Sequence, residues 1–201
     1  MIRKLLLGVF LAMVLVFTTA LSQAITVGFD PVSQDVPLGN PVVVDLVISG
    51  LGNYEPPSLG VFDLDITYNP TILDFTGYVL GPYLGNTASG EALDLSWGET
   101  APGLVNIAEL SLLFDWELDA LQAGSFTLAS LTFDTLALGT SPLGLSINAL
   151  GDALGDRLTA EIQNGSVSVV PEPASLFLLC IGLVGLGNFR RRMSNGERRD
   201  L

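Results

Sequence analysis

The chain has 201 residues, of which 49% are hydrophobic, and its formal net charge at pH 7 is −13. The charge is uneven, because residues 25–170 hold 18 acidic side chains and one basic residue, Arg157, a formal net charge of −17. Nucleic acid is therefore excluded as a partner, since phosphate binding needs clustered lysine and arginine. The single cysteine, Cys180, lies outside this stretch, so apolar burial and strand pairing, not disulfides, must stabilise it.

The first 24 residues are typical of a cleavable secretion signal. Arg3 and Lys4 precede an apolar run over residues 5–17, and small residues follow up to Ala24. This order of a charged region, a short apolar region and a small-residue site predicts a signal helix cleaved after Ala24, with Ala20 as the second choice. An uncleaved N-terminal anchor is the alternative, but the apolar run is short for a span of roughly 20 residues.

Residues 25–170 form one domain in which several runs alternate with the two-residue period of half-buried strands. Residues 41–49 are rich in valine and predict a central strand. In residues 61–68, one face carries Phe62, Leu64, Ile66 and Tyr68, and the other carries Asp63 and Asp65, which we expect to be solvated.

Residues 110–118 also alternate and predict a strand with Leu112, Phe114, Trp116 and Leu118 on one face. Residues 125–133 direct Phe126 and Leu128 inward and then, after a change of phase, Leu131 and Phe133, which predicts a bulge or a fully buried strand. Residues 143–147 and 165–170 add two further strands. Residues 150–161 have the weakest strand pattern and fit a loop or a short helix equally well.

Glycine, proline and asparagine separate these runs at short intervals, as in Asn69-Pro70 and Ser141-Pro142. Many short strands with such turns favour an all-β sandwich or jelly roll over a parallel sheet with crossover helices.

Three segments resemble cohesin domains: FDLDITYNPTILDF (residues 62–75), GSFTLASLTF (124–133) and NGSVSV (164–169). They occur in the cohesin order and cover most of residues 25–170. The resemblance implies a jelly-roll β-sandwich of about nine strands, and cohesins bind dockerin modules through one sheet face. No motif in this sequence marks the residues of that face, and fold alone does not establish dockerin binding.

The C-terminal segment, residues 171–201, combines three features. Pro171-Glu172-Pro173 interrupts the strand pattern, and an uncharged apolar run follows over residues 174–189. As a helix this run would be about 24 Å long, and Arg190, Arg191 and Arg192 end it, with stems able to extend the apolar length. These features predict a transmembrane helix with the body outside the cytoplasm and the arginines inside.

This arrangement closely resembles the PEP-CTERM sorting signal of Gram-negative bacteria, in which a Pro-Glu-Pro box, an apolar segment and a basic cluster follow one another. The resemblance implies an exported protein that is anchored in the inner membrane with its body in the periplasm. An exosortase would then process it near the box and deliver it to the cell surface or to an exopolysaccharide matrix.

The sequence favours a protein without enzymatic activity. It contains no histidine, and Cys180 lies in the apolar run, so no nucleophile–base pair can be assembled. Asp115, Glu117 and Asp119 have the spacing that opens a calcium loop, but the glycine and the final acid of such a loop are absent. We therefore expect no catalytic residue, metal site or cofactor.

Two tryptophans are candidates for stacking on sugar rings. Trp116 shares a strand face with Phe114 and Leu118, so we expect it in the core. Trp97, beside a turn, is the candidate for sugar stacking.

The leading hypothesis is a non-enzymatic, exported surface protein whose cohesin-like module binds polysaccharide or a dockerin-like protein in the extracellular matrix. The alternatives are a glycan hydrolase that uses two carboxylates and a passive structural component of the matrix.

Overall fold

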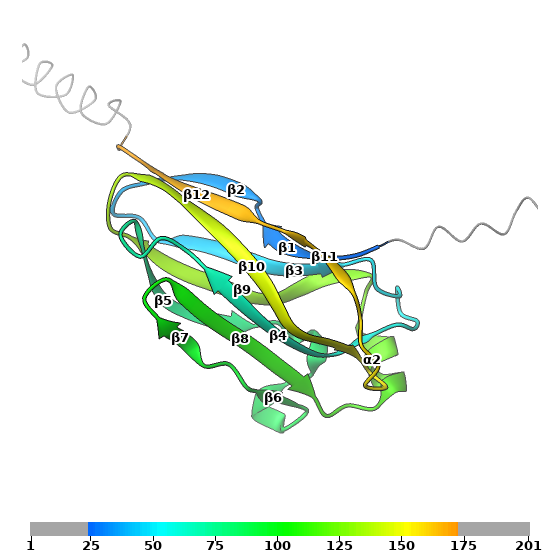
Figure 1. Cartoon of the computed structure of the whole chain (residues 1–201). Coiled ribbons are helices and arrows are strands. Elements are labelled where there is room, and N and C mark those ends of the chain that lie inside the picture. Colours follow the sequence, from blue (N-terminus) through cyan, green and yellow to red (C-terminus); the bar gives the residue numbers. More distant parts are fainter. Residues whose placement is uncertain (1–23, 173–201) are drawn as a thin grey trace, which may run out of the picture.

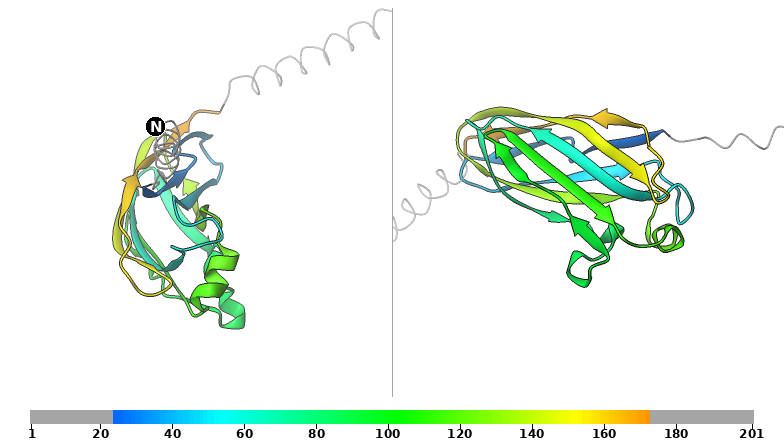
Figure 2. Two further views of the ribbon diagram at one scale, coloured as in Figure 1. Left: turned by 90° about the vertical axis from the view of Figure 1, so that its right-hand side faces the viewer. Right: turned by 60° about the horizontal axis from the view of Figure 1, so that its bottom comes forward.

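The computed structural model describes residues 24–172, which fold into two β-sheets packed face to face (Figures 1 and 2). Twelve strands and one α-helix lie within this part of the chain. The strands are β1 (Ile25–Asp30), β2 (Ser33–Pro37), β3 (Val42–Ser49), β4 (Leu59–Thr67), β5 (Leu73–Leu80), β6 (Ala92–Asp94), β7 (Gly98–Ala101), β8 (Leu104–Ser111), β9 (Ser125–Thr135), β10 (Gly139–Asp152), β11 (Ala160–Gln163) and β12 (Gly165–Val170). The α-helix is α2 (Asp115–Leu121), and two 3₁₀ turns are η1 (Pro82–Leu84) and η2 (Thr87–Ser89).

The five-stranded sheet has the order β11-β1-β3-β9-β5 among the described residues. The seven-stranded sheet has the order β2-β12-β10-β4-β8-β6, and β7 pairs with β8 beyond β6 along the same edge. Neighbouring strands are antiparallel except for β1 with β11 and β2 with β12. Within this sandwich β3 is a central strand, as the valine-rich run predicts.

Alternate residues of the strands fill the space between the sheets. Phe62, Leu64 and Ile66 of β4 are fully buried, and β8 places Ile107 directly beside Leu64. Burying each large apolar side chain contributes about 1.5–3 kcal/mol, so the pattern of alternation is also the main source of stability.

The change of phase in β9 is a β-bulge, one of the two alternatives that the sequence left open. Ala129 pairs with Leu46 of β3, but the next pair joins Thr127 to Val47, so Leu128 has no partner opposite it. The extra residue lets Leu128 and Ala129 both face the core, where they are 1% and 0% exposed.

Two expectations about the strands are wrong. The described residues contain twelve strands where about nine were expected, because β6, β7 and β11 are short edge strands of three or four residues. The expected strand over residues 110–118 ends at Ser111 and is followed by α2. Residues 150–161 contain the end of β10, a turn and the start of β11, so the strand and loop alternatives are each confirmed in part and the short helix does not form.

The two ends of the sandwich differ in the segments that they bring together. β10 spans the length of the body, with Gly139 paired to Val169 of β12 at one end and Asp152 paired to Leu59 of β4 at the other. α2 and the start of β1 lie at the Asp152 end, whereas the chain leaves β12 at the Gly139 end (Figure 1).

The expected signal helix over residues 1–23 and the expected transmembrane helix after Pro173 lie outside the described residues. Within residues 24–172 no helix is long and apolar enough to cross a membrane.

Candidate functional site

Trp97 lies where the edge of the seven-stranded sheet is interrupted. β6 and β7 both pair with β8, and residues 95–97 bulge between them. Gly98 ends the bulge with a φ of 66°, a left-handed conformation that glycine adopts without strain. The side chain of Trp97 is 82% exposed, so it has the accessibility that a sugar-stacking residue requires.

Hydrogen bonds hold the bulge against β8. The Ser96 hydroxyl accepts from the amide N–H of Ala108 at 3.0 Å and donates to its carbonyl at 3.2 Å. The amide N–H of Ser96 donates to Asp94 Oδ1 at 2.9 Å, and that of Trp97 donates to Asn106 Oδ1 at 3.4 Å. The indole is therefore carried on a fixed backbone, which lowers the entropy lost when a ligand binds.

The environment of Asp94 keeps this carboxylate charged. Burial alone would raise its pKa, but hydrogen bonds from Ser96 and from the Tyr78 hydroxyl lower the pKa below its ordinary value. The Tyr78 hydroxyl donates to Asp94 Oδ2 at 2.9 Å. The same partial burial, with the bond to Asp94, raises the pKa of Tyr78.

A row of polar side chains runs from this bulge across the outer face of the sheet. Asn106 Nδ2 donates to Asp63 Oδ1 at 2.7 Å and to Asp65 Oδ1 at 2.9 Å. Asn148 Nδ2 donates to Asp63 Oδ1 at 3.2 Å. Asp63 and Asp65 are thus half-buried and hydrogen-bonded, not simply solvated as expected. Each keeps a second oxygen that can accept a hydrogen bond from a hydroxyl.

Trp116 is not in the core, which corrects the expectation from the alternating pattern. It lies on α2 and is 65% exposed, and the ring of Phe114, 68% exposed, stacks near it with centroids 6.2 Å apart. Helical spacing buries only Leu118 among the four residues expected to face inward. The Glu117 carboxylate accepts from the Phe114 amide at 2.9 Å and stabilises the first turn.

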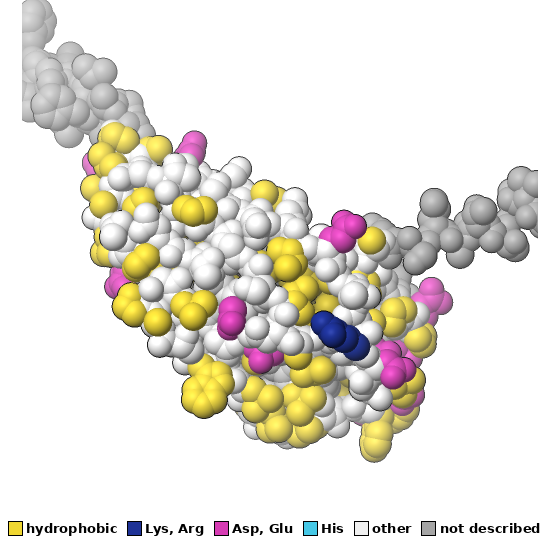
Figure 3. Space-filling model, in the orientation of Figure 1, with side chains coloured by type: hydrophobic (Ala, Val, Ile, Leu, Met, Phe, Trp, Pro, Cys, Tyr) yellow, Lys and Arg dark blue, Asp and Glu magenta, His cyan; other side chains and the backbone are white. Residues whose placement is uncertain are grey.

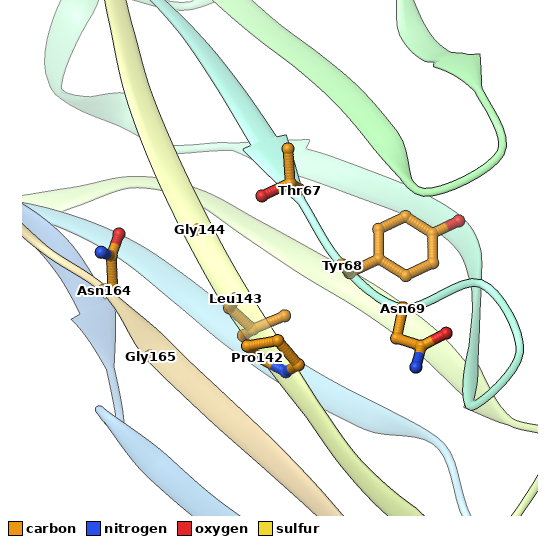
Figure 4. A pocket seen from close by; sticks show the side chains of 8 residues that line it. All are labelled: Thr67, Tyr68, Asn69, Pro142, Leu143, Gly144, Asn164 and Gly165. Carbon is orange, nitrogen blue, oxygen red and sulfur yellow. The ribbon is translucent and has the colours of Figure 1, made fainter.

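A groove of about 300 Å³ opens where β4 ends, beside the first residues of β10 (Figure 4). Gly144 lines it and lies close to Thr67, since a Cβ at position 144 would lie 2.4 Å from the Thr67 hydroxyl oxygen. Its lining contains no acidic residue; the lining residues are Thr67, Tyr68, Asn69, Pro142, Leu143, Gly144, Asn164 and Gly165.

Tyr68 closes one side of this groove, and its hydroxyl donates to Glu99 Oε1 at 2.6 Å. Burial, followed by this hydrogen bond, raises the pKa of Tyr68 to about 12. Tyr68 is therefore a neutral donor at every physiological pH, and its role in the groove is structural.

A second pocket, of about 200 Å³, lies between η1, η2 and β8 and contains one carboxyl group, that of Glu109. Glu109 is 1% exposed, and neither carboxyl oxygen has a hydrogen-bond partner among the described residues. Burial, and to a smaller extent the charge of Asp94, raises the pKa of Glu109 to about 7. Neither of these two pockets offers the pair of facing carboxylates that a glycoside hydrolase uses.

The sorting segment begins directly after the body. Pro171 and Glu172 are exposed and follow β12 without a linker. Pro173 and the arginines Arg190, Arg191 and Arg192 lie outside the described residues. Ala24 is exposed and directly precedes β1, and cleavage after it stays a prediction.

Comparisons with known proteins agree with both parts of this architecture. Residues 169–192 match the family model of the PEP-CTERM protein-sorting motif. None of the curated protein sequences matches the chain significantly.

Several solved cohesin structures are similar to the body. One is the sixth cohesin of scaffoldin B from Acetivibrio cellulolyticus, solved in complex with a mutant Cel5 dockerin. Its TM-score is 0.58 and its sequence identity is 18%, and the match covers 74% of this chain and 100% of that chain. The cohesin of the Coh-OlpA–Doc918 complex from Clostridium thermocellum has a TM-score of 0.59 and 13% sequence identity, and the match covers 74% of this chain and 100% of that chain. The non-cellulosomal cohesin from Archaeoglobus fulgidus has a TM-score of 0.57 and 16% sequence identity, and the match covers 77% of this chain and 97% of that chain.

The body therefore has the cohesin fold, a class of β-sandwich whose solved members include dockerin complexes. This particular chain joins that fold to an exosortase-type sorting motif at its C-terminus.

Proposed function

We propose that this chain is an exported, non-catalytic surface protein that an exosortase sorts through Pro171-Glu172-Pro173 and whose body binds polysaccharide of the extracellular matrix. The sorting motif supports the first half of this proposal, and the cohesin fold supports a binding module. The three arginines at positions 190–192 stop the tail in the inner membrane until the chain is processed.

One observation carries the choice of ligand: Trp97 is 82% exposed on a bulge that hydrogen bonds hold in place. The exposed indole offers a large flat apolar face, which suits the apolar face of a sugar ring. The hydroxyls of such a sugar would find acceptors in Asp63 and Asp65. A formal charge of −17 in the body favours a neutral polysaccharide over an acidic one.

A dockerin-like protein is the other candidate ligand, because cohesins of the same fold occur in complexes with dockerins. Binding of a dockerin module is therefore the second outcome of the binding test. The hydrolase and the passive structural role have no comparable support from the described side chains.

Affinity electrophoresis in gels that contain neutral polysaccharides tests the ligand, with residues 25–170 as the probe because the buried core lies between Val27 and Val169. We expect the change Trp97→Ala to weaken retardation about tenfold or more, since it removes one large apolar contact. Trp116→Ala is the matched control, because Trp116 is also exposed but lies on α2.

If the unmodified body shows no retardation with any neutral polysaccharide, the ligand proposal is wrong, and a pull-down with dockerin modules decides the second candidate. Equal retardation of the two variants would place the binding site elsewhere on the body.

Mass spectrometry of the mature protein tests the sorting proposal separately. We expect an N-terminus at Ile25 and a C-terminus near Pro171-Glu172-Pro173. A chain that still ends at Leu201 in cells with an active exosortase would contradict it.

A further inference from the structure

The end of the sandwich where the chain leaves β12 is built from four loops that contact one another. The amide N–H of Leu38 donates to the carbonyl of Val170 at 2.9 Å, and that of Gly39 donates to the Thr135 hydroxyl at 2.7 Å. The amide N–H of Leu136 donates to the carbonyl of Ile72 at 2.8 Å. The amide N–H of Tyr68 donates to the carbonyl of Gly103 at 3.0 Å. The loops over residues 38–41, 69–72, 102–103 and 136–138 thus lie at this end of the body, and we call their outer surface the exit rim.

The exit rim is apolar although the body is strongly acidic. Leu136 is 53% exposed, Leu138 is 52% exposed and Leu38 is 36% exposed, and Pro70 and Pro102 are exposed beside them. None of the four loops contains a charged residue, whereas residues 25–170 contain 18 acidic ones. In the space-filling view, hydrophobic side chains lie near the point where the chain leaves the body, and acidic side chains lie beside them (Figure 3).

The sequence places the apolar run of the tail very close to this rim. Only Pro171, Glu172 and Pro173 separate Val170, the last residue of β12, from the uncharged run over residues 174–189. Three residues span at most about 10 Å even when fully extended. Val170, the residue beside Leu38 of the rim, therefore stays within about that distance of the start of the apolar run.

We propose that the exit rim docks on the lipid surface of the membrane, with its leucines at the boundary between headgroups and acyl chains. This inference rests on the proposed function, in which residues 174–189 anchor the chain. The occupant is lipid because the rim is apolar, uncharged and tethered at the distance of the bilayer surface. The lipid is zwitterionic, since a body with a net charge of −17 is repelled by anionic headgroups.

Docking also agrees with the positions of the acidic residues nearest to the exit rim. Asp74 and Asp134, which pair across β5 and β9, lie behind the loop tips and would stay in the aqueous layer. Glu99, whose carboxylate accepts from the Gly103 amide at 3.3 Å, is a further charge beside the rim and would lie in the same layer. The rim would hold the body upright with α2 farthest from the membrane. It would also present Pro171-Glu172-Pro173 at the surface in which the sorting enzyme works.

Electron paramagnetic resonance of the full chain in phosphatidylcholine vesicles tests the docking. A nitroxide is attached at Leu138→Cys in a Cys180→Ser background, and the matched control is Leu154→Cys, an exposed leucine at the opposite end of the body. We expect the label at position 138 to lose accessibility to a water-soluble nickel complex and to gain accessibility to oxygen. The label at position 154 should remain in water. Circular dichroism verifies that both variants are folded.

A label on the native Cys180 separates failure of the docking from failure of the anchor. If Cys180 reports lipid while position 138 reports water, docking is wrong and the anchor stands. If both report water, the anchor and the docking are wrong together. If position 138 becomes protected only when the exosortase is added to the vesicles, the rim binds the enzyme, and the lipid proposal is overturned.

Discussion

At the scale of single residues, Glu109 lies at a position where the strand alternation predicts an apolar side chain. It lies on the same face of β8 as Val105 and Ile107 and pairs with the fully buried Phe62 of β4. A carboxylate without partners in such a place is strongly disfavoured relative to the neutral acid. Glu109 therefore makes the stability of the body depend on pH.

The change Glu109→Gln tests this dependence. The pKa is about 7 in the folded body and 4.5 is its ordinary value, so between these pH values the unfolded chain releases the proton first. The free energy of unfolding should therefore fall as pH rises from 4.5 to 7, by about 3 kcal/mol in total. Urea unfolding of Glu109→Gln should show this decrease removed, whereas Glu161→Gln, at an exposed position of β11, should retain it. A persistent decrease in Glu109→Gln would refute the assignment.

At the scale of elements, α2 shows how distant contacts override a local alternating pattern. Gln122, which follows the helix, accepts from the amide of Leu59 at 2.6 Å and donates to the carbonyls of Leu59 and Tyr83 at 2.8 and 3.0 Å. These bonds hold the C-terminal end of α2 beside β4 and η1. In this position the helix buries the side chain of Leu118 and leaves that of Trp116 exposed.

Alanine substitutions in α2 distinguish the helix from the strand that the sequence suggests. Leu118→Ala should lower the free energy of unfolding by about 2–5 kcal/mol, because it leaves a cavity in the core. Trp116→Ala should change it by about 0.5 kcal/mol or less, as for other exposed positions. Chemical denaturation of both variants measures the difference. Equal losses would mean that both side chains face the core, as in a strand.

At the scale of the whole molecule, the body is a self-contained unit that directly precedes the PEP-CTERM sorting motif. Its buried core extends from Val27 to Val169, and the only cysteine lies outside it. Stability thus comes from the apolar layer between the sheets and from the strand ladders.

We expect residues 25–170 to unfold in one cooperative transition whose midpoint is the same with and without a reducing agent. Thermal unfolding followed by circular dichroism, with and without dithiothreitol, measures this. Because residues 25–170 contain no cysteine, the reducing agent serves only as a control, and two separate unfolding transitions would contradict the prediction.

The sequence by itself determined the features that depend on neighbouring residues. The alternation in β4, the bulge in β9 and the sorting motif after Val170 are all local patterns, and a local pattern is visible in one chain without its partners. The short edge strands β6 and β7 were missed because three or four residues carry too little periodicity to be recognised.

Only the tertiary structure decided which side chains meet. The exposure of Trp97 and Trp116, the burial of Glu109, the bonds from Asn106 to Asp63 and Asp65, and the exit rim all depend on pairings between strands far apart in the sequence. The alternation of Val105, Ile107 and Glu109 indicates in the sequence that Glu109 shares a strand face with two apolar residues. That this face is buried is decided by β4 and η1, which pack beside it, because burial depends on neighbours in space and not on neighbours along the chain.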